Sequence, residues 1–544
     1  MSVHDLTNSA LNAADAAAED AGQHDDADDR GKASAATTLV EIAEAKFRFG
    51  SSDTGEAFAV PLQGPRVVCL LRGNRSLRSR LAREYFSQKR KAAPQQALAD
   101  ALLVIEGMAQ ENDPEELHLR VAEHQHDIYV DLGDDTGRAV RIADGDWSVV
   151  THPPMLFKRT ALTGILPAPE RGGSLDLLWS RMNICKADRP LVIAWLMSCF
   201  LPDIPKPVLS LKGEQGTGKS TAQKRIVQTI DPSPVPLRKP PRDAESWVTA
   251  AAGSWVVALD NLSDIPAWLS DSICRAVTGD GDIRRKLYTD GEHHVFAFRR
   301  CVILNGIDIG SSRGDLAERM LPIDLDVIPE HKRMTEAEAW EHWEHEHPLI
   351  LGALLRELAS VASVIPSVRL GSKPRMADFA RVLAAVDQVH GTNGLQRYLE
   401  KQNELSADSL AGDAFIVRLM ERGRIEGTAS DLLESLTPER PPKGWPGSAR
   451  AVTQRLRRHA PSLRRCGWHV ADDGGRNHRN SLVWTLAPPI HPEIACNSYS
   501  QDSQDSQSAS YASVASQEYG PSQDDIPNCP ACDGEGCRHC EVQS

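Results

Sequence analysis

Four short apolar runs in the middle of the chain share one pattern. Segments with helical spacing, such as Thr221 to Thr229, alternate with them. The runs are Val208 to Leu211, Trp255 to Leu259, Cys301 to Leu304 and Leu321 to Leu325. Such runs are typical of buried strands, and their alternation with helices is typical of an α/β layer. The pattern predicts an α/β domain, which we place at residues 154–370.

The pattern is different before this domain. Residues 97–107 have helical spacing, and residues 127–150 alternate between apolar and polar side chains as short strands do. We therefore expect an N-terminal α+β accessory domain at residues 39–153. Its sequence offers no identifiable chemistry.

After the α/β domain, helical patterns predominate. They cover about residues 375–390, 413–422, 429–436 and 448–459, and strand-like residues 467–470 and 481–486 flank a turn at Asp473, Gly474 and Gly475. The order of the last three helices and the two strands is similar to that of a winged helix. We expect a helical, winged-helix-like domain at residues 371–490.

Both ends of the chain lack the apolar residues that a core requires. Residues 1–38 are rich in alanine and acidic residues, and residues 491–526 repeat Ser, Gln, Asp and Tyr. Such compositions cannot bury enough apolar surface to offset the entropy of ordering the chain. We expect a disordered acidic tail, a disordered linker and a small cysteine knuckle at residues 527–544. The whole is a multidomain α/β protein, because single cores stop growing at about 250–300 residues and this chain has 544.

Composition and charge exclude some functions. No uninterrupted apolar run approaches the roughly 18–20 residues that cross a bilayer, and the acidic N-terminus lacks the cationic start and apolar centre of a signal peptide. We therefore expect a cytoplasmic protein without a membrane partner. The formal net charge of −14 does not exclude nucleic acid, because a local basic face binds phosphates whatever the total charge.

The loop after the first apolar run fits the P-loop pattern of phosphate-binding proteins. Its glycines let successive backbone N–H groups point inward at phosphate oxygens. Lys219 would add a positive charge near the β- and γ-phosphates of ATP, and the Ser220 hydroxyl would bind Mg²⁺. The expected nucleotide-binding residues are Gly213, Glu214, Gln215, Gly216, Thr217, Gly218, Lys219, Ser220 and Thr221.

Polar residues at the other strands extend this site. Asp260 ends the second run, where P-loop proteins place an acid of the magnesium shell; the alternative is an ordinary turn residue. Asn305 ends the third run and would orient the attacking water. Arg319, just before the fourth run, would be an arginine finger that stabilises charge on the transferred phosphoryl group. The alternative for Arg319 is a surface salt bridge to Glu318 or Asp315.

The order of the P-loop, Asp260, Asn305 and Arg319 resembles that of superfamily III helicases, within the AAA+ group. It looks most like the ATPase half of viral and phage primase-helicases, as found on bacterial mobile elements. A further segment contributes Thr278, Gly279, Asp280, Gly281, Asp282, Arg284, Arg285 and Tyr288. The resemblance covers about residues 192–325. It implies that Asp260 is the Walker B acid, that Asn305 is sensor 1, and that Arg319 acts in trans in a homo-oligomer, often a hexamer.

The sequence departs from that family in one place. Relatives usually carry a second acid beside the Walker B aspartate, whereas this chain has Asn261, whose amide cannot accept a proton from water. Either Asp264 reaches the site or hydrolysis is slow. No primase motif is apparent in the first half of the chain.

A basic stretch lies near the end of the predicted winged helix. Residues 443–479 contain nine Lys and Arg residues and two Asp residues. Arginines on the predicted helix at residues 448–459 would contact DNA phosphates or enter a groove. The alternatives are a solvated basic face and an interdomain salt-bridge surface. The expected DNA-binding residues are Arg450, Arg455, Arg457 and Arg458.

Four of the eleven cysteines form two CxxC pairs close to the C-terminus. Thiolates are preferred ligands of tetrahedral Zn²⁺ in segments too short to have a core, so we expect a zinc site, with His539 as a bystander. The first pair resembles one arm of the zinc modules of bacterial J-domain chaperones, although the spacer between the pairs is very short. Redox-active or simply reduced thiols are the alternatives. The expected zinc ligands are Cys529, Cys532, Cys537 and Cys540.

Two functions fit these features. The first is an ATP-driven helicase or translocase that acts on single-stranded or forked DNA in phage or mobile-element replication. The second is an ATP-gated DNA-binding initiator or scaffold with little hydrolysis. Asn305 and Arg319 favour the first, and Asn261 favours the second. A small-molecule P-loop kinase is disfavoured because the sequence has no evident lid or acceptor site.

Overall fold

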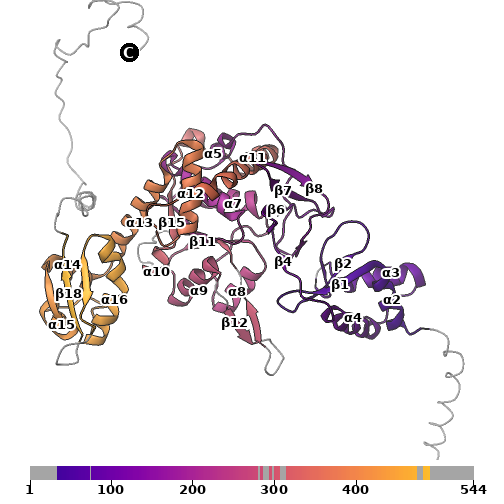
Figure 1. Ribbon diagram of the computed structural model, residues 1–544, viewed down its shortest axis with the longest axis horizontal. Helices are drawn as coiled ribbons and strands as arrows, with labels where there is room; N and C mark the ends of the chain where they lie inside the picture. Colours follow the sequence, from indigo (N-terminus) through magenta and orange to yellow (C-terminus); the bar gives the residue numbers. More distant parts are fainter. Residues whose placement is uncertain are drawn as a thin grey trace, which may run out of the picture. The chain divides into compact units, whose positions relative to one another are not determined.

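The computed structural model describes residues 33–73, 75–279, 282–285, 293–296, 299–306, 314–474 and 482–489 (Figure 1). For residues 282–285 and 293–296 it describes the backbone alone. The chain divides into two units, residues 1–490 and 491–544, and all described residues belong to the first unit.

A four-stranded parallel sheet contains the four predicted strands. They are β10 (Val208–Lys212), β11 (Val256–Leu262), β14 (Cys301–Gly306) and β15 (Met320–Asp324). The order across the sheet is β11-β14-β10-β15, and each neighbouring pair is parallel. All four strands therefore end at one edge of the sheet, the carboxyl edge, and begin at the opposite edge, the amino edge.

Both faces of this sheet are covered, because successive side chains of a strand point to opposite faces. On β14, Cys301 and Ile303 belong to one hydrophobic cluster, whereas Val302 and Leu304 belong to another. The first cluster includes α6 (Arg189–Cys199), α7 (Lys219–Ile230) and α11 (Glu336–Val364), and the second includes α8 (Ala244–Ala252) and α9 (Ala267–Thr278). Burial on both faces explains why the strands are continuous apolar runs.

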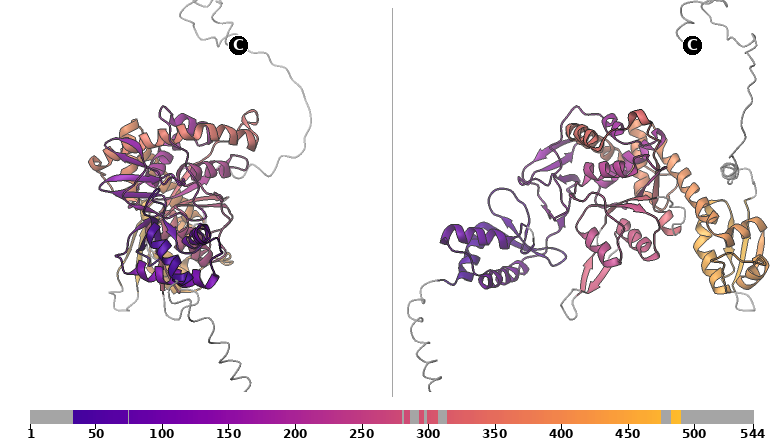
Figure 2. Two further views of the ribbon diagram at one scale, coloured as in Figure 1. Left: turned by 90° about the vertical axis from the view of Figure 1, so that its right-hand side faces the viewer. Right: turned by 180° about the vertical axis from the view of Figure 1, so that it is seen from behind.

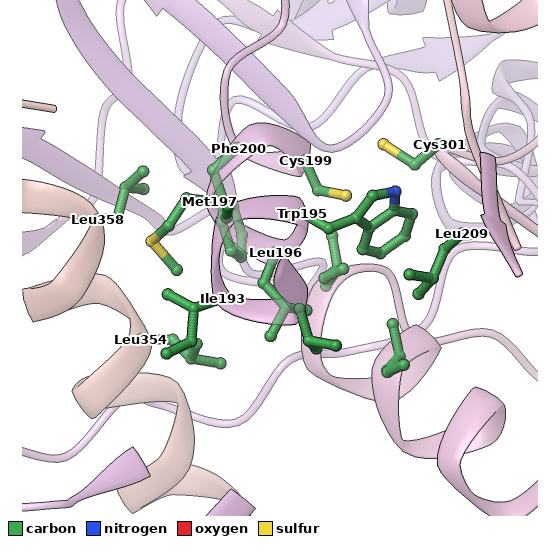
Figure 3. Packing of buried hydrophobic residues seen from close by; sticks show 14 of the residues in the cluster. Ile193, Trp195, Leu196, Met197, Cys199, Phe200, Leu209, Cys301, Leu354 and Leu358 are labelled. Carbon is green, nitrogen blue, oxygen red and sulfur yellow. The ribbon is translucent and has the colours of Figure 1, made fainter. Parts of the chain in front are cut away.

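Helix α6 lies in the middle of the first cluster. Every residue from Leu191 to Cys199 is buried, and Figure 3 shows α6 side chains between Leu209 of β10 and two leucines of α11, Leu354 and Leu358. Among the described residues, α11 together with the short η3 (Ile365–Ser367) is long and apolar enough to cross a membrane, but half of its most apolar window is buried. Its packing is that of a core helix.

Residues 39–153 contribute to separate hydrophobic clusters. Helices α2 (Ala35–Lys46), α3 (Leu77–Lys89) and α4 (Gln95–Gln110) share a cluster with the sheet β1 (Phe47–Ser51), β2 (Ala57–Pro61) and β3 (Cys69–Leu70). A second sheet has the order β5 (Val121–His124), β6 (Asp127–Asp131), β7 (Ala139–Ala143) and β8 (Asp146–Val150). Strand β4 (Leu117–His118), which precedes the second sheet along the chain, pairs with β9 (Leu156–Phe157), which follows it.

The second sheet does not share the core of α2 to α4. Its Val130, Val140 and Trp147 belong to the cluster of α6 and α11, and β7 and β8 contact α11. The sequence grouped residues 39–153 in one accessory domain, whereas the structure divides their apolar contacts. The physical reason is that the buried face of β5 to β8 is covered by helices that come much later in the chain.

The remaining helices follow the parallel sheet. They are α5 (Leu175–Arg181), η1 (Lys186–Asp188), α10 (Gly314–Ala317), η2 (Glu330–Lys332), α12 (Ala377–His390) and α13 (Gly394–Ala411). Helix α12 confirms the helix predicted at residues 375–390, whereas α13 was not predicted. The C-terminal elements are α14 (Ala414–Arg422), β16 (Ile425–Thr428), α15 (Ala429–Leu436), α16 (Ala449–Arg465), β17 (His469–Asp472) and β18 (Val483–Ala487).

These C-terminal elements share one hydrophobic cluster, which includes Leu419, Leu456 and Trp484. The three strands are antiparallel in the order β16-β18-β17. The predicted helices are confirmed, but α16 continues past its predicted end at His459 to Arg465. The continuation is stabilised because it buries Leu463 in the same cluster, although Pro461 removes one helical hydrogen bond.

Candidate nucleotide-binding site

The loop between β10 and α7 has a conformation that glycine adopts most easily. Gly213, Gly216 and Gly218 have φ angles of 148°, 86° and 82°, which L side chains rarely adopt. A Cβ atom on Gly213 would also lie 2.8 Å from Oγ1 of Thr217 and 3.1 Å from the carbonyl oxygen of Leu325. The predicted strand before the loop and the predicted helix after it are both present.

Lys219, the first residue of α7, folds back over this loop. Its Nζ atom donates hydrogen bonds to the carbonyl oxygens of Gly213 and Glu214, both at 2.7 Å. The hydroxyl of Thr217 donates to the same Glu214 carbonyl at 2.9 Å. The loop therefore holds an ammonium group at its centre, with polar atoms that would exchange partners if a phosphate entered.

Ser220, Asp260 and Asn305 come together at the carboxyl edge of the sheet. The Ser220 hydroxyl donates to Oδ1 of Asp260 at 2.9 Å, and the amide of Asn305 donates to the same Oδ1 at 2.8 Å and to the Ser220 hydroxyl at 3.1 Å. They meet because β14, which carries Asn305, lies between β10 and β11. A hydroxyl and a carboxylate are the kind of hard oxygen ligands that Mg²⁺ prefers, so these residues fit a magnesium-bound phosphate.

Gln223 supports this arrangement and was missed in the sequence. It is fully buried, and its amide donates to the backbone oxygens of Leu259 on β11 and Ile303 on β14, at 3.0 and 3.3 Å. It thereby connects α7 to the two strands that carry Asp260 and Asn305. The only signal in the sequence was a polar residue on the buried face of a predicted helix, four positions after Lys219.

Asn261, at the position of the missing second acid, leaves the strand geometry. Its φ angle is 57°, the register of β11 shifts between Leu259 and Leu262, and its side chain is exposed. Asp264 is exposed as well. Within the described residues, neither side chain forms a hydrogen bond with Asp260.

Arg319 lies at the amino edge of the sheet, one strand length from the P-loop of its own chain. Its carbonyl oxygen accepts from the N–H of Val208, the first residue of β10, at 2.7 Å. The guanidinium is buried, pairs with the carboxylate of Asp315 and donates to the Asp315 carbonyl oxygen at 2.9 Å. Burial alone would raise the pKa of Asp315, but the hydrogen bond and charge of Arg319 hold that pKa below its usual value.

This geometry separates the two hypotheses for Arg319. The salt bridge to Asp315 exists within the chain, while Glu318 contacts Arg465 instead, at 3.3 Å. The described strands do not bring Arg319 together with Lys219 or Asp260.

The segment between β11 and β14 contains an antiparallel hairpin. Its strands are β12 (Asp282–Arg285) and β13 (His293–Phe296), and it projects from the rest of the unit in Figures 1 and 2. Arg284 and Arg285 lie on β12, opposite His294 and His293. Asp280, Gly281 and Tyr288 lie outside the described residues.

The four arginines predicted to bind DNA differ in their surroundings. All lie on α16, where Arg450, Arg457 and Arg458 are exposed. Their spacing of seven and eight residues places them on one helix face. Arg455 is partly buried, and it donates to the Asp413 carboxylate at 3.2 Å and to the Gly444 carbonyl oxygen at 2.8 Å. Arg455 therefore stabilises the start of α14, to which Asp413 is the N-cap.

Two family models match this chain, and both describe one kind of protein. Residues 175–408 match the replication protein of actinomycete integrative conjugative elements, called AICE RepA, and residues 414–498 match the AICE RepA C-terminal domain. These two regions are RepA-like. The first RepA-like region runs from the start of α5 into α13 and contains the P-loop, Asp260, Asn305 and Arg319. The second RepA-like region starts at α14 and contains α16.

Solved structures that resemble the chain include proteins described as helicases. SCCmec type IV Cch, an active helicase, is 14% identical with a TM-score of 0.40 over 81% of this chain and 93% of its own. The apo C-terminal region of NrS-1 is 12% identical with a TM-score of 0.34 over 75% and 84%. The JCV helicase is 12% identical with a TM-score of 0.23 over 43% and 64%. No curated protein matches the chain.

The predicted zinc ligands Cys529, Cys532, Cys537 and Cys540 lie outside the described residues and after the second RepA-like region. Within the described residues, His, Cys, Asp and Glu side chains form no group that would hold a metal ion. The zinc site stays a prediction from the sequence.

Proposed function

We propose that this chain is an ATP-hydrolysing DNA helicase or translocase that acts in the replication of a mobile element. The observation that carries the proposal is the hydrogen-bonded group of Ser220, Asp260 and Asn305 beside the P-loop. The first RepA family model supports a role in replication, because it describes a replication protein and its match includes these three residues. A replication protein with an ATP site is expected to use hydrolysis to move or remodel DNA.

Each residue has a distinct part in the proposed reaction. The P-loop amides and Lys219 would bind the β- and γ-phosphates. Ser220 and Asp260 would hold Mg²⁺, which when bound neutralises charge on the phosphates. Asn305, already fixed by two hydrogen bonds, would orient a water for attack. Arg319 would enter the site of a neighbouring copy, so hydrolysis would require a homo-oligomer.

DNA contact is assigned to the second RepA-like region. Its order of helix, strand, helix, helix and two strands is that of a winged helix, in which the third helix enters the major groove or follows the backbone. Here that helix is α16, and its exposed arginines are Arg450, Arg457 and Arg458. Positive side chains on one exposed face would bind DNA phosphates independently of sequence.

One observation favours a second function, an ATP-gated initiator or scaffold with little hydrolysis. Asn261 takes the place of the second acid and is turned out of the strand with a positive φ angle. A site without a general base would still bind Mg-ATP, and binding alone would then set the oligomeric state. The two functions differ in turnover rather than in affinity.

The discriminating experiment compares ATP hydrolysis with and without single-stranded DNA, for the native chain and Lys219→Ala. DNA-stimulated turnover that the substitution abolishes is expected for the motor. Tight binding of ATP without turnover, in the presence or absence of DNA, would reject the motor in favour of the switch. Turnover that Lys219→Ala leaves intact would reject the P-loop as its source.

A further inference from the structure

The chain that leaves β15 passes directly along the P-loop. β15 ends beside β10, with Asp324 opposite Lys212, and the N–H of Leu325 donates to the Lys212 carbonyl oxygen at 3.0 Å. Residues 325–333, which we call the strap, therefore start at the carboxyl edge of the sheet. The P-loop starts at the same edge.

Three glycines of the P-loop lie close to atoms of the strap. A Cβ atom on Gly213 would lie 3.1 Å from the Leu325 carbonyl oxygen, one on Gly218 would lie 3.1 Å from Cδ1 of Ile328, and one on Gly216 would lie 3.8 Å from Nη2 of Arg333. Contacts at the beginning, middle and end of the strap show that it follows the loop. The last contact places a guanidinium beside the middle of the P-loop.

Both ends of the strap are anchored. At its start it continues from β15, and after its end the Thr335 capping box begins α11. Helix α11 is held against α7, because the Arg225 guanidinium lies 4.7 Å from the ring centroid of Trp343 and 5.2 Å from that of Trp340. Helices α7 and α11 contact each other directly. The position of Arg333 relative to the P-loop is thus set from both sides.

Arg333 differs from Lys219 and Arg319, the two cations described above. Lys219 donates to two backbone oxygens, and Arg319 pairs with Asp315. The side chain of Arg333 is exposed and has no hydrogen-bond or ion-pair partner in the part of the chain that the structure describes. A guanidinium held beside a phosphate-binding loop without a partner is suited to a bidentate contact with a phosphate.

We propose that Arg333 binds the polyphosphate of the nucleotide held by the P-loop of the same chain. The proposal rests on the proposed ATP site and adds a phosphate-binding residue to it. It also distinguishes the two arginines: Arg333 would bind the nucleotide of its own chain, whereas Arg319 lies at the opposite edge of the sheet and is paired with Asp315. Arg333 is not placed in proton transfer or in magnesium binding.

The test measures binding of Mg-ATP and Mg-ADP by calorimetry to the native chain, Arg333→Ala and Arg333→Lys. Arg78→Ala, which removes an exposed arginine from α3, is the matched control. Losing a charged hydrogen bond to phosphate should weaken binding by about 10- to 100-fold, with Arg333→Lys intermediate and Arg78→Ala unchanged. The melting temperature of the nucleotide-free protein should be the same for all variants.

The outcomes separate this inference from the proposed function. If the native chain binds ATP but Arg333→Ala binds it as tightly as Arg78→Ala does, the assignment of Arg333 is wrong and the ATP site stands. If the native chain binds no ATP, the proposed ATP site is itself wrong, and the proposed function is rejected together with the role of Arg333. A mixture of Lys219→Ala and Arg333→Ala chains should show no recovery of turnover, because neither has a complete site, and recovery would contradict a role within one chain.

Discussion

The two edges of the parallel sheet use polar residues in opposite ways. At the carboxyl edge, Ser220, Asp260 and Asn305 come from three segments and bond to one another. At the amino edge, Arg319 is buried and paired with Asp315, four residues before it. The carboxyl edge therefore gathers polar groups from three segments of one chain, while at the amino edge the guanidinium of Arg319 is already paired within its own chain.

The difference follows from strand direction. In a parallel sheet all strand ends meet at one edge, so residues distant in the sequence gather there. The residues that begin the strands gather at the other edge and cannot reach across the strands. A bound nucleotide at the carboxyl edge would thus need a neighbour to supply Arg319, and that need would couple hydrolysis to assembly.

Lys219→Ala should have the largest effect, because it removes the ammonium from the centre of the P-loop. We expect loss of measurable ATP binding and a fall in turnover of more than about 10³-fold. Lys224→Ala, five residues further along α7, is the control and should retain turnover. Equal activities of the two variants would mean that the carboxyl edge is not the site.

Arg319→Ala should reduce turnover by about 10³-fold while ATP affinity changes by less than about threefold. Asp315→Asn tests the internal ion pair and should retain most turnover. Because the missing group acts in trans, mixing Arg319→Ala with Lys219→Ala chains should restore part of the activity. A variant that hydrolyses ATP at the native rate would reduce Arg319 to a structural salt bridge.

The C-terminal arginines test whether DNA binding lies apart from both edges. Replacing Arg450, Arg457 and Arg458 together by Gln should weaken binding to single-stranded DNA by about 100-fold at low salt and reduce the salt dependence of binding. Arg455→Gln is the matched control, since its contacts with Asp413 and Gly444 are internal. Fluorescence anisotropy at several salt concentrations measures both the affinity for DNA and its salt dependence. Equal losses for the control and the triple variant would remove α16 as the DNA-binding face.

Asn261→Asp adds the missing acid at the carboxyl edge, and Asp tolerates the positive φ angle. If the absence of a base limits hydrolysis, turnover should rise by about tenfold or more with unchanged ATP affinity. Steady-state kinetics with saturating ATP measures the change. Unaltered turnover would mean that another group already serves as the base.

The buried His347 on α11, the helix that follows the strap, should make the stability of the protein depend on pH. Burial, helped by the charge of Arg225, lowers its pKa to about 4, below the usual value near 6.5. The unfolded chain therefore binds a proton that the folded chain does not, and stability should fall as the pH drops from about 6.5 toward 4. Thermal melts should show a weaker acid destabilisation in His347→Leu. The same pH dependence in both proteins would exclude His347 as a cause.

The sequence predicts the local parts of this structure well. The four strands of the sheet, the P-loop and α7 follow from apolar runs and glycine spacing, which act over a few residues. For Arg319, a salt bridge to Glu318 or Asp315 was the alternative to an arginine finger, and the structure contains the pair with Asp315. The positions of Gln223, Arg333 and Arg455 were not predictable, because each depends on contacts with residues 30 or more positions away.

The division of residues 39–153 shows the same limit. Alternation predicted the strands at residues 127–150, but periodicity does not say which helix covers a strand. Val130 and Trp147 pack in the cluster of α6 and α11, which come later in the chain. The fold class was therefore accessible from local pattern, whereas the core that each element joins was not.

The most direct test of the account is a calorimetric titration of the native chain with ATP in the presence of magnesium, repeated with Lys219→Ala. We predict saturable binding near one nucleotide per chain for the native protein and none for the variant. Absence of binding by the native protein, or equal binding by both, would contradict the assignment of the carboxyl edge as a nucleotide site.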